Sequence, residues 1–259
     1  MRTALVTGAA RGIGAATVRR LVETGHHVVA LDWCAGDSVP GLSPQATRAD
    51  LESLASAYDG QVLPLIADVR EPTALTQAVD LALERAGQLD VVVAAAAVIT
   101  GGSALWETDP AELDLMWDID VLGVWNTAVA AVPALLANPD PAGCRFVAVA
   151  SSAAQHGLFH LAGYTAAKHA VAGMVKALAA DLAGTGVTAC AISPGSTATA
   201  MLQATATLYD VDTTELASHQ LLRRTLTPDE IAATIAFACS LEGAAFNGSI
   251  INADGGFTP

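Results

Sequence analysis

Short apolar runs alternate with longer segments in which apolar residues recur at helical spacing, from one end of the chain to the other. The runs predict strands at residues 3–7, 27–31, 62–67, 90–96, 145–150, 187–193 and 249–252. The helical spacing predicts helices at residues 13–23, 72–86, 110–136, 164–183 and 228–240. Strands that are apolar on both faces and alternate with helices form parallel sheets that helices cover on each side. We therefore expect an α/β fold: one doubly wound domain over residues 1–259, with a parallel seven-stranded sheet and helices on both faces.

Two stretches follow neither pattern. Residues 33–48, after the second strand, contain several Gly, Pro and Ser, and residues 196–225 lie between the sixth strand and the last helix. Long loops at the C-terminal ends of parallel strands are where ligands usually bind in such sheets. We therefore expect an irregular insertion at residues 33–48 and a substrate lid at residues 196–225.

The composition argues against several classes of protein. Hydrophobic residues make up 53% of the 259 positions and charged residues 15%, which is not typical of a disordered chain. Lys and Arg number 12 against 26 Asp and Glu, which gives a formal charge of −14. Phosphate backbones and anionic lipid surfaces repel a chain of this charge, so we expect neither nucleic acid nor a membrane as partner.

Cysteine usage and the length of the apolar runs indicate a soluble cytoplasmic protein. The four cysteines lack the spacing of metal ligands, so we expect no metal site and no disulfide framework, as in a reducing compartment. The longest unbroken apolar run covers residues 91–99, and we expect that no segment approaches the length of a membrane span. The chain starts directly on its first predicted strand, without the anatomy of a signal peptide.

A glycine-rich turn joins the first strand to the first helix in the sequence Thr7-Gly8-Ala-Ala-Arg-Gly12-Ile-Gly14. Gly8 permits a tight turn, Gly12 lets the backbone approach a pyrophosphate, and Gly14 allows close packing of helix and sheet. Any tight strand–helix turn uses glycines, but this position favours a Rossmann-type dinucleotide site. Asp32 ends the second strand, where an acid binds the adenosine ribose hydroxyls and repels a 2′-phosphate. We therefore expect NAD rather than NADP, the alternative being an ordinary loop carboxylate.

A tyrosine and a lysine lie one helical turn apart at Tyr164 and Lys168, so their side chains share a face. A phenol titrates near ~10, and an adjacent ammonium stabilises the phenolate. Such a pair is common on helix surfaces. Here the strand at residues 145–150 also ends in Ser151, whose hydroxyl would reach the same crevice and bind a substrate oxygen. The combination indicates a site for proton transfer.

Taken in order and spacing, these motifs resemble those of the short-chain dehydrogenase/reductase family, in its single-domain branch, over essentially the whole chain. The matching residues are Thr7-Gly8-x-x-x-Gly12-x-Gly14, Asp68-Val69, Ser151, Tyr164-x-x-x-Lys168, Pro194-Gly195-x-x-x-Thr199 and Asp254-Gly255-Gly256. The resemblance implies an NAD-dependent oxidoreductase that interconverts a secondary or small lipophilic alcohol and its carbonyl by hydride transfer. It also implies a homotetramer, with the helices at 110–136 and 164–183 and the strand at 249–252 at the interfaces.

The resemblance assigns roles to individual residues. Tyr164 would transfer the proton, Lys168 would hold the nicotinamide ribose and lower the pKa of the tyrosine, and Ser151 would orient the substrate oxygen. The implied cofactor contacts are Gly8, Arg11, Gly12, Ile13, Gly14, Asp32, Trp33, Asp68, Val69, Ala94, Ala95, Ala96, Tyr164, Lys168, Pro194, Gly195, Thr197 and Thr199.

The chain departs from the family at two places. Ala94-Ala95-Ala96-Ala97 stands where the family usually has Asn-Asn-Ala-Gly, although the backbone there can still line the adenosine ribose. Asp120 stands where the family has the asparagine that completes the catalytic tetrad, and we expect it in the catalytic group. Two possibilities remain open. Its main-chain carbonyl would hold a relay water as in the family, or its carboxylate would face Lys168, keep the ammonium charged and alter the proton relay.

A finer resemblance is to the short-chain dehydrogenases associated with mycofactocin. It rests on Asp32-Trp-Cys34, Val39-Pro40, Ala46-Thr47, Asp50-Leu51 and Gly157-Leu-Phe-His160. It implies NAD that stays bound through turnover and passes its electrons to mycofactocin, a peptide-derived redox carrier. The insertion after Asp32 would cover the adenine end of the cofactor, the alternative being a lengthened surface loop.

The substrate side is less determined. The candidates by position are Trp106, Gln155, His156, Phe159, His160 and the segment at 201–222, whose apolar residues suggest a lipophilic alcohol or ketone. Two other functions stay open: an extended-type epimerase or dehydratase with tightly bound NAD, and a catalytically silent NAD-binding sensor or scaffold. The glycine spacing argues against the first. Ser151, Tyr164 and Lys168 argue against the second, whereas Asp120 and the alanine run mildly favour it.

Overall fold

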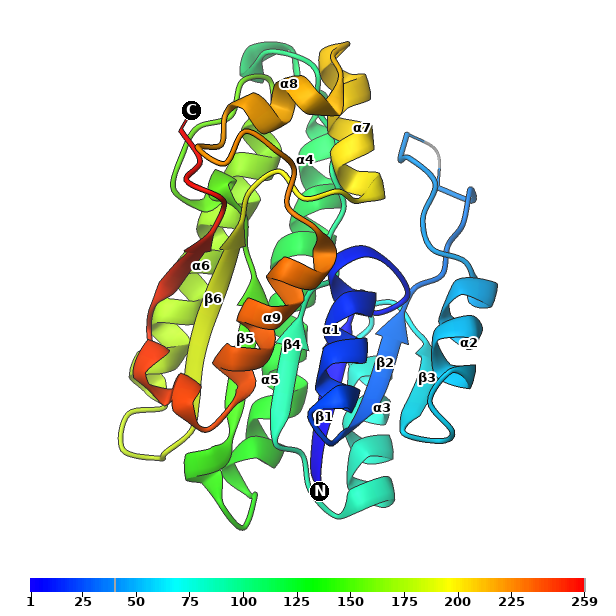
Figure 1. Cartoon of the computed structure of the whole chain (residues 1–259), viewed down its shortest axis with the longest axis vertical. Coiled ribbons are helices and arrows are strands. Elements are labelled where there is room, and N and C mark those ends of the chain that lie inside the picture. The colour runs from blue at the N-terminus through cyan, green and yellow to red at the C-terminus, as the bar shows by residue number, and fades with distance from the viewer. Residues whose placement is uncertain (40, 259) are drawn as a thin grey trace.

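A computed structural model describes residues 1–39 and 41–258, and in this part of the chain seven strands form one parallel sheet (Figure 1). Their order across the sheet is β3-β2-β1-β4-β5-β6-β7. The strands are β1 (Arg2–Thr7), β2 (His26–Asp32), β3 (Val62–Ile66), β4 (Val91–Ala94), β5 (Arg145–Val149), β6 (Thr188–Pro194) and β7 (Ile250–Ala253). The predicted doubly wound, Rossmann-type sheet is therefore confirmed.

The chain begins in the middle of the sheet and builds outward in both directions. β1 pairs with β2 on one side and with β4 on the other, and Thr7 and Ala94 are partners at the C-terminal end of the β1–β4 pair. The loops that leave β1 and β4 therefore diverge toward opposite faces. This divergence opens the crevice in which doubly wound sheets bind ligands.

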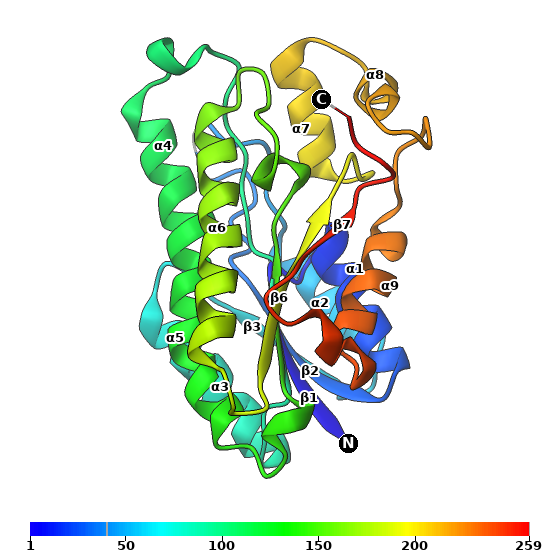
Figure 2. The same cartoon turned by 90° about the vertical axis from the view of Figure 1, so that its left-hand side faces the viewer.

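Two layers of helices cover the sheet, as the side view shows (Figure 2). One apolar core lies under α3 (Pro72–Ala86), α5 (Leu122–Leu136) and α6 (Ala162–Asp181). The other lies under α1 (Gly12–Glu23) and α9 (Pro228–Cys239). Because both faces of the strands are buried, the strands are apolar throughout, which is the pattern that predicted them.

The two irregular stretches contain helices that we did not predict. α2 (Arg48–Ser56) follows the insertion, and α7 (Ala200–Tyr209) and α8 (Thr213–Ser218) lie within residues 196–225. The expectation of an irregular segment at 196–225 was therefore wrong in part. The described residues between Trp33 and Thr47 form neither helix nor strand. Pro40, part of the mycofactocin-type motif, lies outside the described residues.

The predicted helix at 110–136 is divided into α4 (Pro110–Met116), a π-helical turn (Trp117–Val121) and α5. Its 27 residues are long and apolar enough to cross a membrane by length and composition. The expectation that no segment approaches that length was therefore wrong, because it counted only unbroken apolar runs. In the fold this helix packs on α3 and on α6, and 44% of its apolar window is buried.

Candidate active site

A cavity of about 860 Å³ opens at the C-terminal ends of the strands, and residues of α7 and α8 contribute to its lining. The sheet, the glycine turn, the start of α6 and the segment after β6 all contribute to its walls. The cavity therefore lies at the crevice that the strand order creates.

The glycine turn has the geometry that its sequence predicts. Gly8 and Gly12 have φ angles of +65° and +56°, in the left-handed region that favours glycine. A Cβ on Gly8 would lie 2.7 Å from Cα of Ala96, and one on Gly14 would collide with the carbonyl oxygen of Gly8. The N-cap residue of α1, Arg11, makes no side-chain hydrogen bond to the first amides of the helix. The first amides of this helix are thus available to an anion in the cavity.

Asp32 lies at the end of β2 with its carboxylate held by two backbone amides. Oδ2 accepts a hydrogen bond from the amide of Ala10 at 2.9 Å, and Oδ1 accepts one from Cys34 at 2.9 Å. The residue is 9% exposed and lines the cavity. Each oxygen keeps a lone pair for a further donor, so the carboxylate is fixed but still able to bind hydroxyl groups.

The wall beyond Asp32 contains an aromatic ring and an anion, and a cation that does not line the cavity contacts both. Trp33, Asp68 and Val69 line the cavity. The guanidinium of Arg70 lies 4.4 Å from the Trp33 ring centroid, and its Nη2 is 2.5 Å from Oδ2 of Asp68. Sequence reasoning missed Arg70, because only the fold brings it over the ring of Trp33. Trp33 and Val69 therefore offer apolar contacts suited to an aromatic base, and Arg70 packs on the Trp33 ring from outside the cavity wall.

Arg11 links the glycine turn to the insertion. Its guanidinium donates hydrogen bonds to the carbonyl oxygen of Pro44 at 2.5 Å and to Oε1 of Gln45 at 3.4 Å. Gln45 and Ala46 line the cavity, which the sequence did not indicate for these two residues individually. The end of the insertion is therefore tied to the turn at the edge of the cavity.

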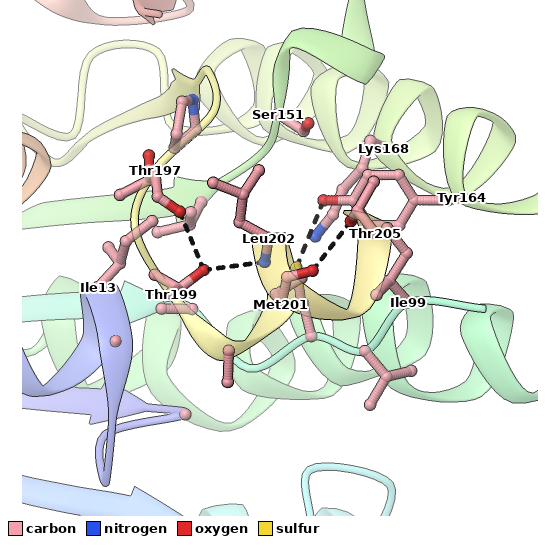
Figure 3. Close-up of a pocket in the computed structure, with 18 of the residues that line it drawn as sticks. Ile13, Ile99, Ser151, Tyr164, Lys168, Thr197, Thr199, Met201, Leu202 and Thr205 are labelled. Carbon is pink, nitrogen blue, oxygen red and sulfur yellow. Dashed lines mark hydrogen bonds between the residues drawn. The ribbon is translucent and has the colours of Figure 1, made fainter. Parts of the chain in front are cut away.

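The cavity wall opposite Asp32 and Trp33 contains Ser151, Tyr164 and Lys168 (Figure 3). Ser151 follows β5, whereas the tyrosine and the lysine project from the first turns of α6. Lys168 Nζ lies 5.4 Å from the centroid of the Tyr164 ring, and the tyrosine hydroxyl donates to Sδ of Met201 at 3.9 Å. The three residues predicted as a catalytic group are thus brought together at the cavity.

Asp120 lies behind this group, in the π-helical turn. It is 0% exposed, and its Oδ2 is 3.1 Å from Nζ of Lys168, which is 2% exposed. Oδ1 accepts a hydrogen bond from the amide of Val98 at 2.8 Å. Of the two possibilities left open by the sequence, the structure therefore has the carboxylate facing Lys168. Asp120 does not line the cavity.

The ionisable groups of this cluster change one another's pKa values. Burial raises the pKa of Tyr164; the Lys168 ammonium opposes this effect, the Asp120 carboxylate reinforces it, and the Ser151 hydroxyl opposes it. Burial alone would lower the pKa of Lys168, but Asp120 and Tyr164 raise it above its ordinary value. Lys168 is therefore held as an ammonium ion, in contact with Asp120.

The alanine run is tied to the sheet through its backbone. The hydroxyl oxygen of Thr7 accepts hydrogen bonds from the amides of Ala95 at 3.1 Å and Ala96 at 3.3 Å. These two alanines line the cavity, but Ala94 does not, because it is buried as the last residue of β4. The other expected cofactor contacts all lie in the wall: Gly8, Arg11, Gly12, Ile13, Gly14, Asp32, Trp33, Asp68, Val69, Tyr164, Lys168, Pro194, Gly195, Thr197 and Thr199.

The part of the cavity next to Tyr164 is mainly apolar. Of the substrate-side candidates, Phe159 and His160 line the cavity, together with Met201, Leu202, Thr205, Leu208, Tyr209, Val211, Glu215, Leu216 and His219. Trp106, Gln155 and His156 do not line it; Trp106 is 83% exposed and Gln155 bonds to Asn252. Phe257 also lines the cavity, and no sequence signal pointed to it.

Comparisons with known proteins agree with this geometry. The sequence family described as enoyl-(acyl carrier protein) reductase matches residues 8–258. A Mycobacterium tuberculosis protein named as an uncharacterized NAD-dependent oxidoreductase is 32% identical over 98% of this chain and 95% of its own length. A (−)-trans-carveol dehydrogenase of Rhodococcus erythropolis is 34% identical over 78% of this chain and 73% of its own.

A solved structure supports the same relationship. The crystal structure of carveol dehydrogenase from Mycobacterium avium in complex with NAD superimposes with a TM-score of 0.90. It is 28% identical, and the match covers 98% of this chain and 96% of that one. With the glycine turn, the Tyr164–Lys168 pair and this similarity along its whole length, the chain belongs to the short-chain dehydrogenase/reductase family.

Proposed function

We propose that this chain is an NAD-dependent dehydrogenase/reductase that interconverts a small lipophilic alcohol and its carbonyl compound. The observation that carries the proposal is the meeting of Ser151, Tyr164 and Lys168 in one cavity with the glycine turn. A proton-transfer group and a nucleotide-type turn then face the same space. Hydride transfer beside a proton donor needs this arrangement.

The residues of the cavity fit NAD. The amides at the start of α1 suit its pyrophosphate, and Asp32 suits the ribose hydroxyls while it repels a 2′-phosphate. Trp33 and Val69 suit the adenine, and the segment from Pro194 to Thr199 suits the nicotinamide end. NAD, when bound, supplies the acceptor for the hydride that leaves the alcohol carbon.

The side chains around the alcohol carry the rest of the reaction. Ser151 binds the substrate oxygen and orients it toward the hydroxyl of Tyr164. Tyr164 takes the hydroxyl proton during oxidation and returns it during reduction. Lys168 holds its ammonium beside the phenol and offers N–H donors to the ribose.

The substrate proposal follows from the apolar wall. Met201, Leu202 and Leu208 of α7 face the space next to Tyr164, and we assign residues 196–225 the role of a lid over it. The relatives named as carveol dehydrogenases make carveol, a lipophilic secondary alcohol, the first compound to test.

We also propose that NAD stays bound through turnover and that its electrons pass to mycofactocin. The support is the tie between Arg11 and the insertion, which holds Gln45 and Ala46 in the cavity wall that also contains Trp33. The four cysteines are free thiols, in keeping with a cytoplasmic location.

Replacing the arginine that ties the insertion tests cofactor retention. Arg11→Met removes the hydrogen bonds that tie the insertion to the glycine turn, and bonds from a charged donor contribute about 1.5–3 kcal/mol each. In the proposal this tie must open before NAD leaves, so its loss should make bound NAD leave roughly tenfold faster or more. The measurement is the release rate of NAD from freshly purified protein into buffer that contains an NAD scavenger. Arg19→Met is the matched control, because Arg19 is on α1 but pairs with Asp229 on the surface. Fast release from the unmodified protein would contradict retention.

We propose a homotetramer, and an exposed apolar stripe on α4 and α5 supports it. The exposed residues lie three to five positions apart along α4, the π-helical turn and α5: Leu113, Trp117, Leu122, Trp125 and Val129. Contiguous apolar surface of this kind marks interaction sites. Trp125→Glu should therefore give a smaller assembly by light scattering, whereas Trp106→Glu, an exposed tryptophan outside the stripe, should not. A monomeric unmodified protein would contradict this proposal.

A further inference from the structure

A buried ion pair stands behind the proposed proton-transfer group. Asp120 and Lys168 are 0% and 2% exposed, and Oδ2 of the carboxylate lies 3.1 Å from Nζ of the ammonium. The second carboxylate oxygen is fixed by the amide of Val98, so the carboxylate is held in this orientation from a different segment. The pair is therefore a fixed feature of the site and not a surface contact that solvent screens.

The pair has no net charge, so Lys168 stabilises the phenolate form of Tyr164 less than a lone ammonium would. A lone ammonium beside a phenol stabilises the phenolate strongly. Here a carboxylate in direct contact with the ammonium cancels much of that field, and its own charge disfavours a phenolate. We propose that Asp120 is a positioning residue that neutralises Lys168 and so shifts the pH range of alcohol oxidation toward the alkaline side.

Other ionisable groups near Tyr164 do not offset this effect. The charges that act on the tyrosine are those of Lys168 on its own helix and Asp120 on the π-helical turn. α7 presents the uncharged Met201, and the end of β5 presents Ser151. The other ionisable side chains of the cavity wall are not among the charges that act on Tyr164: Arg11, Asp32, Asp68, His160, Tyr209, Glu215 and His219. With NADH bound, Tyr164 would therefore remain a phenol at neutral pH and act as the acid that protonates a carbonyl oxygen.

The inference rests on the proposed function for its consequence, but its first test needs no turnover. The ultraviolet difference spectrum of phenolate is recorded against pH for the unmodified protein and for Tyr164→Phe, and the difference isolates Tyr164 among the three tyrosines. Tyr164 should ionise at or above the ordinary phenol value of ~10. Ionisation of Tyr164 near neutral pH in the unmodified protein would overturn the inference.

Asp120→Asn removes the charge and keeps an oxygen for the amide of Val98. The Lys168 ammonium, 5.4 Å from the centroid of the Tyr164 ring, then acts on the phenol without the opposing carboxylate. Ionisation of Tyr164 should therefore move roughly 1–3 pH units lower, the shift that an opposite charge at such a distance causes. Asp114→Asn is the matched control, since Asp114 is an exposed acid on α4. An unchanged or higher titration of Tyr164 in folded Asp120→Asn protein would overturn the inference.

The kinetic readout separates this inference from the proposed function. In Asp120→Asn, the pH profile of alcohol oxidation should move to lower pH by the same interval as the phenol titration. If no alcohol is oxidised by any variant, the proposed function fails while the titration result stands. If oxidation proceeds with the same pH profile in both proteins, the inference fails and the proposed function stands.

Discussion

Tyr164→Phe is expected to lose at least ~100-fold in the rate of alcohol oxidation, because general acid–base catalysis typically contributes 10²–10⁴-fold. Tyr164 lines the cavity, and its hydroxyl donates a hydrogen bond to the weak acceptor Sδ of Met201. Its removal should therefore leave the packing intact. The measurement is the rate of reduced nicotinamide formation in a single turnover, with NAD binding measured on the same sample.

The binding measurement gives this experiment its discriminating power. NAD should bind Tyr164→Phe as it binds the unmodified protein, since the glycine turn and Asp32 are unaltered. A second variant, Tyr209→Phe, serves as the control, because its hydroxyl donates to the carbonyl of Phe159 in the same cavity. Equal turnover in Tyr164→Phe and the unmodified protein would contradict the catalytic assignment and favour an NAD-binding sensor.

Lys168→Met is expected to destabilise the fold by about 3–5 kcal/mol, the usual effect of removing one partner of a buried ion pair. Asp120 would remain fully buried with no cation beside it. The measurement is the free energy of unfolding from urea titration. Combining Lys168→Met with Asp120→Asn should restore much of the stability without restoring activity, because no buried charge is left unpaired.

The free energy of unfolding of Lys168→Met should depend on pH, because the substitution leaves the Asp120 carboxylate buried without its partner. Burial raises the pKa of Asp120, and Lys168 is the main group that opposes this. Without the lysine the folded state takes up a proton more readily than the unfolded state. The added stability is then present at acid pH and is lost as the pH rises through the raised pKa. Lys168→Met should therefore be more stable at mildly acid than at mildly alkaline pH, and the opposite trend would contradict the pairing.

Much of the fold could be predicted because its strands are buried on both faces. The apolar runs marked all seven strands to within about two residues, and the longer helices showed a clear apolar period. The missed helices bury little: α2 buries Leu51, α7 buries Ala206 and α8 buries Ala217. A helix that buries one side chain leaves no apolar period in the sequence, so the sequence pattern did not indicate α2, α7 or α8.

The candidate site was predictable where it depends on local spacing. The glycine turn and the Tyr164–Lys168 pair are set by neighbouring residues on one turn or one helix. The contact between Asp120 and Lys168 is different, because it joins two helices and depends on the π-helical turn that carries the aspartate. The positions of Arg70 and Phe257 likewise depend on the packing of segments far apart in the chain, so no sequence pattern indicated them.

The most direct test of the account uses carveol carrying deuterium on the carbinol carbon, added to freshly purified protein without free NAD. Deuterium should appear on the nicotinamide ring of the protein-bound cofactor in the unmodified protein and should fail to appear in Tyr164→Phe. Deuterium that appears equally in both proteins would contradict the role of Tyr164. Bound NAD that stays unlabelled with carveol and with a panel of other lipophilic secondary alcohols would contradict the proposed hydride transfer.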